Sequence, residues 1–325
     1  MNQALRSVAC WAAAAVVLGA LTLMLHGYHA DVYRKMLVTA TLALSFNFLF
    51  GIAQQLAFSH VTFFGLGAYG ITILGAIQGW PMPLAILATL ILAVLLGLVM
   101  SIPTTRLEGF YLGLATFAFA QLFIISLKLG GDVTGGQDGL HGFTTPSLFG
   151  MSLAGRPYTF VIIAVLLATL FVLRNLERSW FGRACRALGD NPEAASAMGI
   201  DVARTKVIVF TLTGTLAAIA GMVYAFVDNY ISPTVFDFDY MFAIFFMTIV
   251  GGSGRQSGVL LGVFVLTVLS EWLSDIVGHR SVLVYGVIVV ISLLFWPTGL
   301  IGLVDLLRAR IARRVPCLRW LGGVR

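Results

Sequence analysis

The sequence predicts an all-α integral membrane protein with about ten transmembrane helices. Of its 325 residues, 59% are hydrophobic and only 10% are charged, whereas a soluble domain carries about 25% charged residues. The charged residues are also segregated along the chain. No Asp, Glu, Lys or Arg occurs between Lys35 and Arg106, or between Lys206 and Asp228. A membrane helix needs about 20 apolar residues, and a charge at its centre costs about 2.5–3.5 kcal/mol. We therefore expect these stretches to be helices and hairpins immersed in lipid.

Ten apolar segments account for the expected spans, and we expect them to form a single transmembrane domain over residues 1–325. In chain order they are Val8–Leu25, Met36–Phe50, Val61–Ile77, Pro83–Ile102, Phe110–Leu127, Tyr158–Leu173, Lys206–Val227, Met241–Gly251, Val259–Val277 and Val282–Phe295. The second and eighth are short, and each runs into a polar or glycine-rich break. The first is longer than a typical signal-peptide core and no small-residue cleavage site follows it closely, so we expect it to be retained as a helix.

Lys and Arg are distributed unequally between the two sides of the expected membrane. When the spans alternate from Arg6, fifteen of the 20 basic residues fall on one side. The other five are Arg34, Lys35, Lys128, Arg156 and Arg280. Basic loops face the cytoplasm, so we expect both termini, the loop 174–205 and the basic tail 305–325 to be cytoplasmic. The loops 130–157 and 228–240 are then external. The net charge of +6 reflects this orientation, and no nucleic-acid partner is expected.

A polar segment interrupts the hydrophobic hairpin formed by the second and third expected spans. Non-helical backbone at membrane depth is tolerated only beside protein or a water-filled cavity, and broken helices of this kind are typical of substrate paths. The candidate path residues are Asn47, Gln54, Gln55, Ser59 and His60, followed by Gly65 and Gly67. Two alternatives stay open: a short cytoplasmic turn in which His60 is an interfacial histidine, and glycines that serve only close helix packing.

Motifs for metal binding, ATP binding and covalent chemistry are absent from the sequence. His60 has no second His, Cys or carboxylate at ligand spacing. Cys10, Cys185 and Cys317 are too far apart to indicate a metal site or a disulfide framework. A phosphate-binding loop needs a Gly-Lys pair before Ser or Thr, but none of the lysines follows a glycine. No cofactor is therefore expected, and an enzyme is the least favoured class of function.

The expected cytoplasmic loop 174–205 contains two short predicted helices. The first, Phe181–Leu188, is expected to end at Gly189. For the second, the run Asn191–Glu193 supplies an N-cap, a proline at the first helical position and an acidic residue in the first turn. Gly199 suits the C-terminal cap of this second helix.

The second of these helices is expected to present a small apolar surface. It consists of Ala194, Ala195, Ala197 and Met198, with Arg183 and Arg186 nearby. Such a surface suits docking into the groove of a partner protein. The alternative is an amphipathic turn at the membrane surface that only spaces two spans.

At this loop the chain resembles a known family. Glu193-Ala194-Ala195, followed after three residues by Gly199, is similar to the coupling motif with which importer permeases engage their ATPase subunits. Over nearly its full length the chain resembles the membrane subunit of branched-chain amino-acid ABC importers, of the longer M-type of the two paired permeases. The other matching positions, in chain order, are Asn47, Gly51, Gln55 and His60 with Phe63–Tyr69, then Arg106–Leu112, Thr134–Leu140, Arg178–Arg183, Val250–Gly262 and Pro297–Gly302.

Four residues depart from the family pattern. Gln54 and Ser59 stand where the family usually has glycine, and Ala57 stands where it has serine. Asp138 replaces the usual asparagine. The first three lie in the expected path, so they bear on the identity of the solute rather than on the fold.

The resemblance implies the permease subunit of an ATP-binding-cassette importer in a bacterial inner membrane. The implied partners are ATPase subunits, a second homologous permease and a periplasmic solute-binding protein. The implied contacts with the ATPase are Arg183, Arg186, Glu193, Ala194, Ala195, Met198 and Gly199. Those facing the binding protein are Thr134, Gly135, Gly136, Asp138 and Gly139.

The implied solutes are branched-chain and other hydrophobic amino acids. The absence of charge at mid-membrane suits a solute without net charge, which leaves urea, short amides and sugars open. A stand-alone secondary transporter is the alternative of a different class, because such carriers place acidic residues or histidines within spans as proton relays. Glu271 and Asp275 are the only such pair in the sequence, and we interpret them as interface residues.

Overall fold

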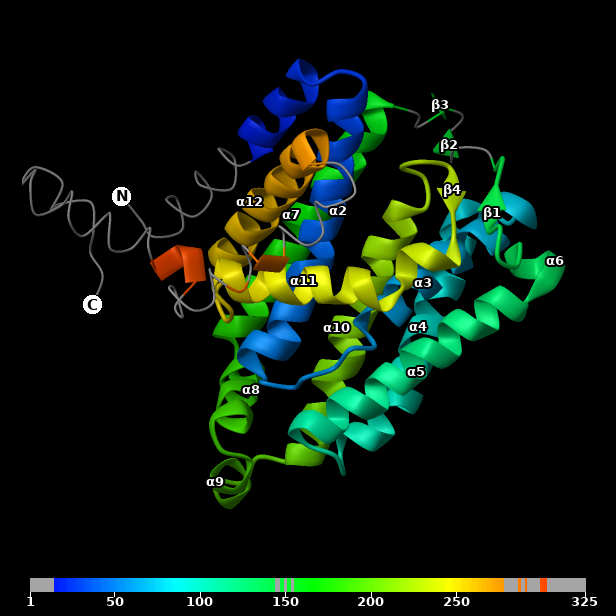
Figure 1. The fold of residues 1–325 in the computed structure, drawn as a ribbon. Helices are drawn as coiled ribbons and strands as arrows, with labels where there is room; N and C mark the ends of the chain where they lie inside the picture. The colour runs from blue at the N-terminus through cyan, green and yellow to red at the C-terminus, as the bar shows by residue number, and fades with distance from the viewer. Residues whose placement is uncertain are drawn as a thin grey trace, which may run out of the picture.

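The computed structural model describes residues 15–143, 147–148, 151–152, 155–277, 286–287, 290 and 299–302. An unlabelled helix, Ala15–Met24, comes first. The α-helices that follow are α2 (Tyr28–Asn47), α3 (His60–Ile71), α4 (Met82–Thr104), α5 (Gly109–Leu129), α6 (Gly131–Thr134), α7 (Arg156–Arg178), α8 (Trp180–Asp190), α9 (Pro192–Ala197), α10 (Val202–Tyr224), α11 (Phe238–Gly251) and α12 (Gln256–Val277). Figure 1 shows them as one bundle. Two π-helical segments, η1 (Phe48–Ile52) and η2 (Thr72–Ile77), extend α2 and α3, and η3 (Pro233–Phe236) is a 3-10 helix.

Among the described residues, seven helices are long and apolar enough to cross a membrane, and two shorter apolar helices accompany them. The shorter ones are Ala15–Met24 and α11. This confirms an all-α membrane protein but not the expected number of ten spans. The expected tenth span, Val282–Phe295, falls almost wholly outside the described residues, as do the tail 305–325 and both termini.

The prediction for the second span was wrong in its start and its length. Together, α2 and η1 form 25 continuous helical residues that begin at Tyr28 rather than Met36. The charged residues of the first two turns are paired: Lys35 Nζ lies 2.8 Å from an Asp228 carboxylate oxygen, and Arg34 lies 2.5 Å from Asp31. Paired charges can lie in the first turns of a helix. A start placed after the last charged residue therefore falls too far along the chain. The short helix expected for the eighth span is present as α11, which has 14 residues and ends at a glycine-rich loop, but it is shorter than the seven helices that can cross a membrane.

The centre of the bundle is formed by α2, α3 and α10, and the rim includes α4 and α5. Of the most apolar window in α2–η1, 78% is buried, against 33% in α4 and in α5. Small residues bring the central helices together: a Cβ added at Gly67 of α3 would lie 2.0 Å from the carbonyl oxygen of Ala218 on α10. Leu87 and Leu95 of α4 are more than half exposed, as expected for a lipid-facing helix.

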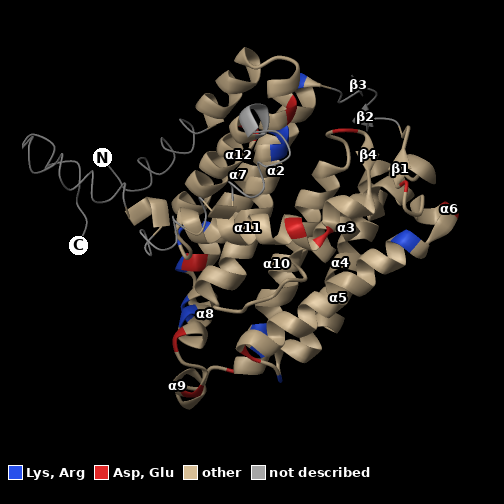
Figure 2. Cartoon of the chain, in the orientation of Figure 1, with Lys and Arg blue, Asp and Glu red and all other residues tan. Residues whose placement is uncertain are grey.

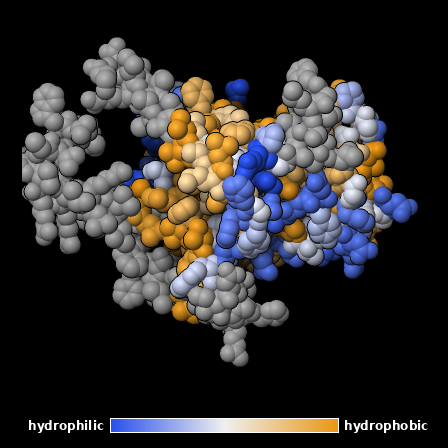
Figure 3. All heavy atoms as spheres, turned by 90° about the horizontal axis from the view of Figure 1, so that it is seen from above, coloured by the Kyte–Doolittle hydropathy of each residue, from blue (hydrophilic) through white to orange (hydrophobic). Residues whose placement is uncertain are grey.

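The loops sort to two ends of the molecule, as alternating spans require. In Figure 1, α8 and α9 lie at one end and α6, β1 and β4 at the other. The strand β1 (Leu140–His141) pairs antiparallel with β4 (Tyr230–Ile231), which joins the two loops expected to be external. A hairpin of β2 (Ser147–Leu148) and β3 (Met151–Ser152) lies in the first of these loops. Charged residues lie mainly near helix ends (Figure 2), and hydrophilic residues gather over the end that carries β1 and β4 (Figure 3).

Cysteine labelling tests which of these ends is cytoplasmic. Native Cys185 is no reporter, because it is fully buried in α8 and burial raises the pKa of its thiol to about 12. In a cysteine-free chain, we expect a cysteine at exposed Ser196 to react with a membrane-impermeant thiol reagent only after the membrane is opened. A cysteine at exposed Gln137 should react in intact spheroplasts. The reverse pattern would contradict the orientation.

Candidate functional site

The polar segment after α2 is a true break in the helix. The π-helix η1 widens the last turns of α2, and residues 53–59 are non-helical before α3 begins at His60. The amide of Ala53 donates to the carbonyl of Phe48, five residues earlier (3.2 Å), and the amide of Gln55 donates to the carbonyl of Leu49, six residues earlier (3.1 Å). The residue spacing of the hydrogen bonds therefore increases until the helix ends. This geometry agrees with the expected broken segment.

His60 is buried inside the protein rather than placed at an interface. Its Nε2 lies 3.1 Å from the hydroxyl of Ser45, which donates to the carbonyl of Leu42. The edge of the imidazole meets the ring of Phe46 at a centroid distance of 5.5 Å. Among the described residues, no group of three His, Cys, Asp or Glu side chains is placed to hold a metal ion. His60 therefore connects α3 to α2.

Asn47 connects the break to a distant loop. Its side-chain oxygen accepts a hydrogen bond of 2.8 Å from the amide of Gly254, in the glycine-rich loop between α11 and α12. Gly51 lies against the same loop, since a Cβ there would be 2.4 Å from the Gly254 nitrogen. Asn47 is 1% exposed. The structure therefore places this candidate path residue in a helix–loop contact.

Gln55 and Ser59 carry the unpaired polar groups of the break. Both side chains are buried, and neither the side-chain amide of Gln55 nor the hydroxyl of Ser59 has a hydrogen-bond partner among the described residues. The hydroxyl of Thr62, in the first turn of α3, is also buried without a hydrogen-bond partner among the described residues. A buried polar group without a partner costs about 1–3 kcal/mol, and in native proteins such groups point to a functional role or to bound water. Gln54, in contrast, is exposed.

The two candidate glycines lie in helix contacts. Gly67 faces α10, as described above, and a Cβ added at Gly65 would lie 2.8 Å from the ring of Phe123 and 3.2 Å from that of Phe236. These neighbours favour the alternative in which both glycines allow close packing.

In the loop after α7, α8 is longer than predicted. It starts at Trp180, where the hydroxyl of Ser179 accepts a hydrogen bond from the amide of Gly182 (3.3 Å). It continues through Gly189 to Asp190, so the expected end at Gly189 was wrong. Leu188 and Cys185 belong to its buried face. Arg183 and Arg186 are exposed, as the expected docking surface requires.

The caps of α9 agree with the sequence. The side chain of Asn191 accepts from the amide of Ala194 (3.0 Å), and Pro192 takes the first helical position. At the other end the amide of Gly199 donates to Ser196, and that of Ile200 donates to Ala195, which is a Schellman motif. Its left-handed position, φ 84°, is filled by Gly199.

One residue of the expected apolar surface is misplaced. Ala195 is fully buried, because it turns toward the body of the protein, whereas Ala194 and Ala197 are exposed. Met198 is 71% exposed and is the largest apolar group on this helix. The exposed surface is therefore Ala194, Ala197 and Met198.

The helix α8, in the loop after α7, is in direct contact with the break, which the sequence did not predict. A Cβ added at Gly189 of α8 would lie 2.9 Å from the carbonyl oxygen of Ile52 and 3.0 Å from Cγ of Gln54. A separate hydrogen bond joins α12 to α7: the side-chain amide of Gln256, at the start of α12, donates to the carboxylate of Glu177 (2.8 Å). Movement of α8 would therefore act directly on the broken segment.

At the opposite end, the segment Thr134–Gly139 is a compact turn. The hydroxyl of Thr134 donates to the carbonyl of Leu127 (2.6 Å), and the amide of Gly139 donates to that of Gly135 (3.1 Å). Gly135, Gly136 and Gly139 all have positive φ, which favours glycine. Asp138 is exposed, and its carbonyl accepts from the hydroxyl of Tyr230 (3.2 Å).

Two features of the site were missed in the sequence. Lys206 is 7% exposed and lies 2.6 Å from the carboxylate of Glu108, which joins the starts of α10 and α5. Phenylalanine rings also gather where α11 passes the break. Their sequence signal is the helical spacing of Phe238, Phe242 and Phe245, which resembles any buried helix face.

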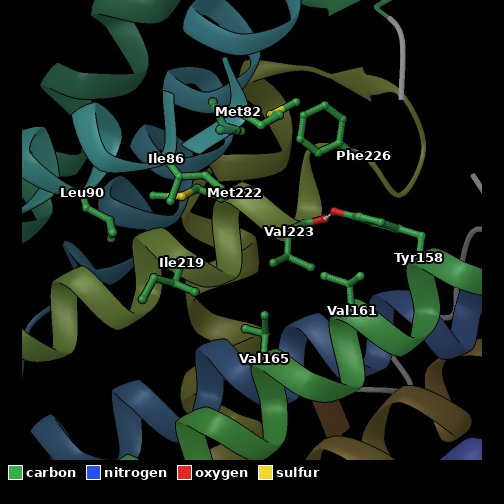
Figure 4. Close-up of a pocket in the computed structure, with 11 residues that line it drawn as sticks. Met82, Ile86, Leu90, Tyr158, Val161, Val165, Ile219, Met222, Val223 and Phe226 are labelled. Carbon is green, nitrogen blue, oxygen red and sulfur yellow. Dashed lines mark hydrogen bonds between the residues drawn. The ribbon is translucent and has the colours of Figure 1, made fainter. Parts of the chain in front are cut away.

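A cavity of about 290 Å³ between α3, α4, α7 and α10 is a poorer candidate for the path. Figure 4 shows its lining, which includes Met82, Ile86, Val161 and Met222. The hydroxyl of Tyr158 is engaged by the carbonyl of Val223 (2.6 Å). With so apolar a lining, this cavity offers little to a polar solute.

Sequence comparison decides the family. The profile described as "Branched-chain amino acid transport system / permease component" matches residues 28–293. The chain belongs to this family. It is similar to the high-affinity branched-chain amino acid transport system permease protein LivM of Salmonella typhimurium, at 28% identity over 83% of this chain and 69% of that protein. The probable branched-chain amino acid transport permease protein LivM of Methanocaldococcus jannaschii is 27% identical over 67% of each chain.

The family context extends to permeases of other solutes. The ribose import permease protein RbsC of Bacillus subtilis is 30% identical over 45% of this chain and 49% of its own length. No solved structure matches the chain. The protein is accordingly a transport permease and not an enzyme, with a multi-pass membrane fold.

The geometry of Gln54 yields a stability prediction. Gln54 has φ 50°, a left-handed conformation that costs a residue with a side chain about 1–2 kcal/mol. Gln54→Gly should therefore raise the apparent Tm of the detergent-solubilised protein by about 2 °C. The matched control is Gln78→Gly, since Gln78 is also exposed but has a φ of −82°, so its replacement should not raise the Tm. A lower Tm for Gln54→Gly than for the wild type would contradict the assignment.

Proposed function

We propose that this chain is the membrane-spanning permease subunit of an ABC importer that translocates branched-chain and other hydrophobic amino acids. The match of residues 28–293 to the permease family carries this proposal. The curated relatives with the name LivM are permeases of branched-chain amino acid transport systems. Because the sequence has no Gly-Lys pair for a phosphate-binding loop, separate ATPase subunits supply the energy. The permease resides in the bacterial inner membrane beside a second homologous permease.

The coupling surface of this permease is α9 with the exposed arginines of α8. Ala194, Ala197 and Met198 form an apolar knob that suits a groove in an ATPase subunit. Arg183 and Arg186 add positive charge beside it. The contact of α8 with the break supports a direct route from ATPase closure to the path, since α8 cannot shift without displacing residues 52–54.

The external turn Thr134–Gly139 is the proposed contact for the periplasmic binding protein. Its hydrogen bonds and its pairing with the loop 228–240 through β1 and β4 make it a stiff surface. Asp138 and Gln137 are exposed on it. A stiff turn loses little entropy on binding, which favours docking of a loaded protein.

The proposed path is the region of the break. Gln55, Ser59 and Thr62 keep unpaired amide and hydroxyl groups there, and these suit a solute that forms hydrogen bonds without net charge. Urea and short amides satisfy the same chemistry and stay the alternative. A stand-alone secondary transporter is less favoured, because Glu271 is engaged by the hydroxyl of Tyr28 at 2.5 Å.

A charge on the apolar knob should uncouple the permease. We expect Met198→Glu to insert normally but to reduce uptake at least about tenfold, since a buried unpaired carboxylate in the interface costs more than 1.4 kcal/mol. Co-purification with the ATPase subunit should fall in parallel. The control is Ala203→Glu, which is also exposed at this end of the molecule but lies outside the knob. Normal transport by Met198→Glu would mean that α9 is only a spacer.

Uptake should follow cellular ATP rather than the proton gradient. In cells lacking this gene, we expect loss of radiolabelled leucine uptake, restored by the intact gene, with urea and ribose uptake unchanged. Collapse of the proton gradient at constant ATP should leave leucine uptake largely intact. Loss of urea uptake alone would assign the protein to the amide alternative. Uptake that vanished with the proton gradient would contradict an ABC importer.

A further inference from the structure

Phenylalanine rings from three segments form one continuous surface, which we call the aromatic wall. It consists of Phe58, Phe117, Phe238, Phe242, Phe245 and Phe246. Phe58 of the break stacks on Phe242 of α11 at a centroid distance of 5.7 Å. Phe117 of α5 meets Phe238 at 4.5 Å. All six side chains are half-buried, so the wall presents part of each ring outward.

The packing of α11 holds these rings in place. Met241, Ile244, Thr248 and Gly251 form the buried face of the helix. The hydroxyl of Tyr240 lies 2.9 Å from that of Thr39 on α2, which fixes the start of α11. The phenylalanines occupy the other side of α11, which crosses the front of the bundle in Figure 1. Their outward position is therefore a consequence of how α11 is anchored.

The surroundings of the wall are not those of a lipid-facing surface. Phe58 lies in the non-helical segment 53–59, and open backbone does not face hydrocarbon. Its amide is satisfied by the hydroxyl of Thr116 (3.0 Å), and exposed Gln54 lies four residues before it. The wall therefore borders water or another protein surface.

We propose that the aromatic wall is the apolar side of the solute path and binds the aliphatic side chain of a net-neutral amino acid. This inference rests on the proposed function and names the residues that select its substrate. The wall itself carries no charge, and the carboxylates of Asp237 and Asp239 lie at its outer end, where they complement an ammonium group. Ring faces also attract such a cation. Gln55 and Ser59, on the same segment as Phe58, carry buried polar groups without a hydrogen-bond partner among the described residues.

The wall also reaches the coupling route. Phe245 meets Phe50 of η1 at 5.2 Å, and Phe50 stacks on Phe46 of α2 at 5.5 Å. The same π-helix ends at Ile52, whose carbonyl lies beside Gly189 of α8. A displacement of α8 that unwinds or rewinds η1 would move Phe50 and therefore change the packing of the wall. Binding of the side chain and its release are in this way linked to the ATPase end.

Water accessibility tests the position of the wall. In a cysteine-free complete transporter, we expect Phe242→Cys to react with a small water-soluble thiol reagent and leucine-loaded binding protein to slow that reaction. The control is Phe171→Cys on α7, because Phe171 is 58% exposed on the outer surface, where a thiol in lipid should not react. A Phe242→Cys variant as unreactive as the control would overturn the proposal. A disulfide between Phe242→Cys and a cysteine introduced into the second permease, without reaction with the reagent, would also overturn it, because the wall would then be a subunit interface.

Leucine uptake tests the role of the wall in binding. We expect Phe242→Ala to lower the leucine uptake rate about tenfold, with an unchanged amount of assembled transporter, and Phe242→Leu to restore most of it. Phe171→Ala should behave as the wild type. Equal uptake by the wild type and Phe242→Ala would overturn the proposed role of the wall in binding while leaving the proposed function in place. A wild-type transporter that does not carry leucine would overturn the proposed function itself, whatever the reactivity of Phe242→Cys.

Discussion

The structure depends on how a broken membrane helix satisfies its backbone. Within hydrocarbon, every amide and carbonyl needs a partner in the protein. Around the break these partners come from separate elements: Thr116 of α5 accepts from the amide of Phe58, and Asn47 binds the amide of Gly254 before α12. The break is therefore held by contacts with α5 and with the α11–α12 loop. The packing of the bundle around the break reflects these contacts.

The same break is in contact with distant parts of the permease. Residues 52–54 touch α8 on one side, and Phe58 touches α11 on the other. A π-helix at this position is consistent with a functional role, because such segments within α-helices are often found at functional sites. The region thus combines a mechanical contact, a set of unpaired polar groups and an apolar surface within a few residues. Few other segments of a helical bundle offer all three, since regular helices satisfy their own backbone.

The sequence predicted features that depend on local chemistry and missed those that depend on distant partners. The caps of α9 follow from Asn191 and Gly199, whose preferences act within one turn. The break was visible as polar residues in an apolar hairpin. The role of Asn47 was not, because its partner Gly254 is 207 residues away. The burial of Ala195 and of Cys185 likewise depends on which face of a short helix the rest of the protein covers.

The ion pair between Lys206 and Glu108 bears on the order in which the chain is assembled. Lys206 lies near the start of a hydrophobic helix and is almost fully buried, while Glu108 precedes it by 98 residues. A lysine that enters the membrane without its partner carries an uncompensated charge. During synthesis, the turn between α4 and α5 is made before α10, so the carboxylate of Glu108 is made before Lys206. An α10 that docks beside that turn has its lysine paired, so the ion pair favours this placement of α10 over others.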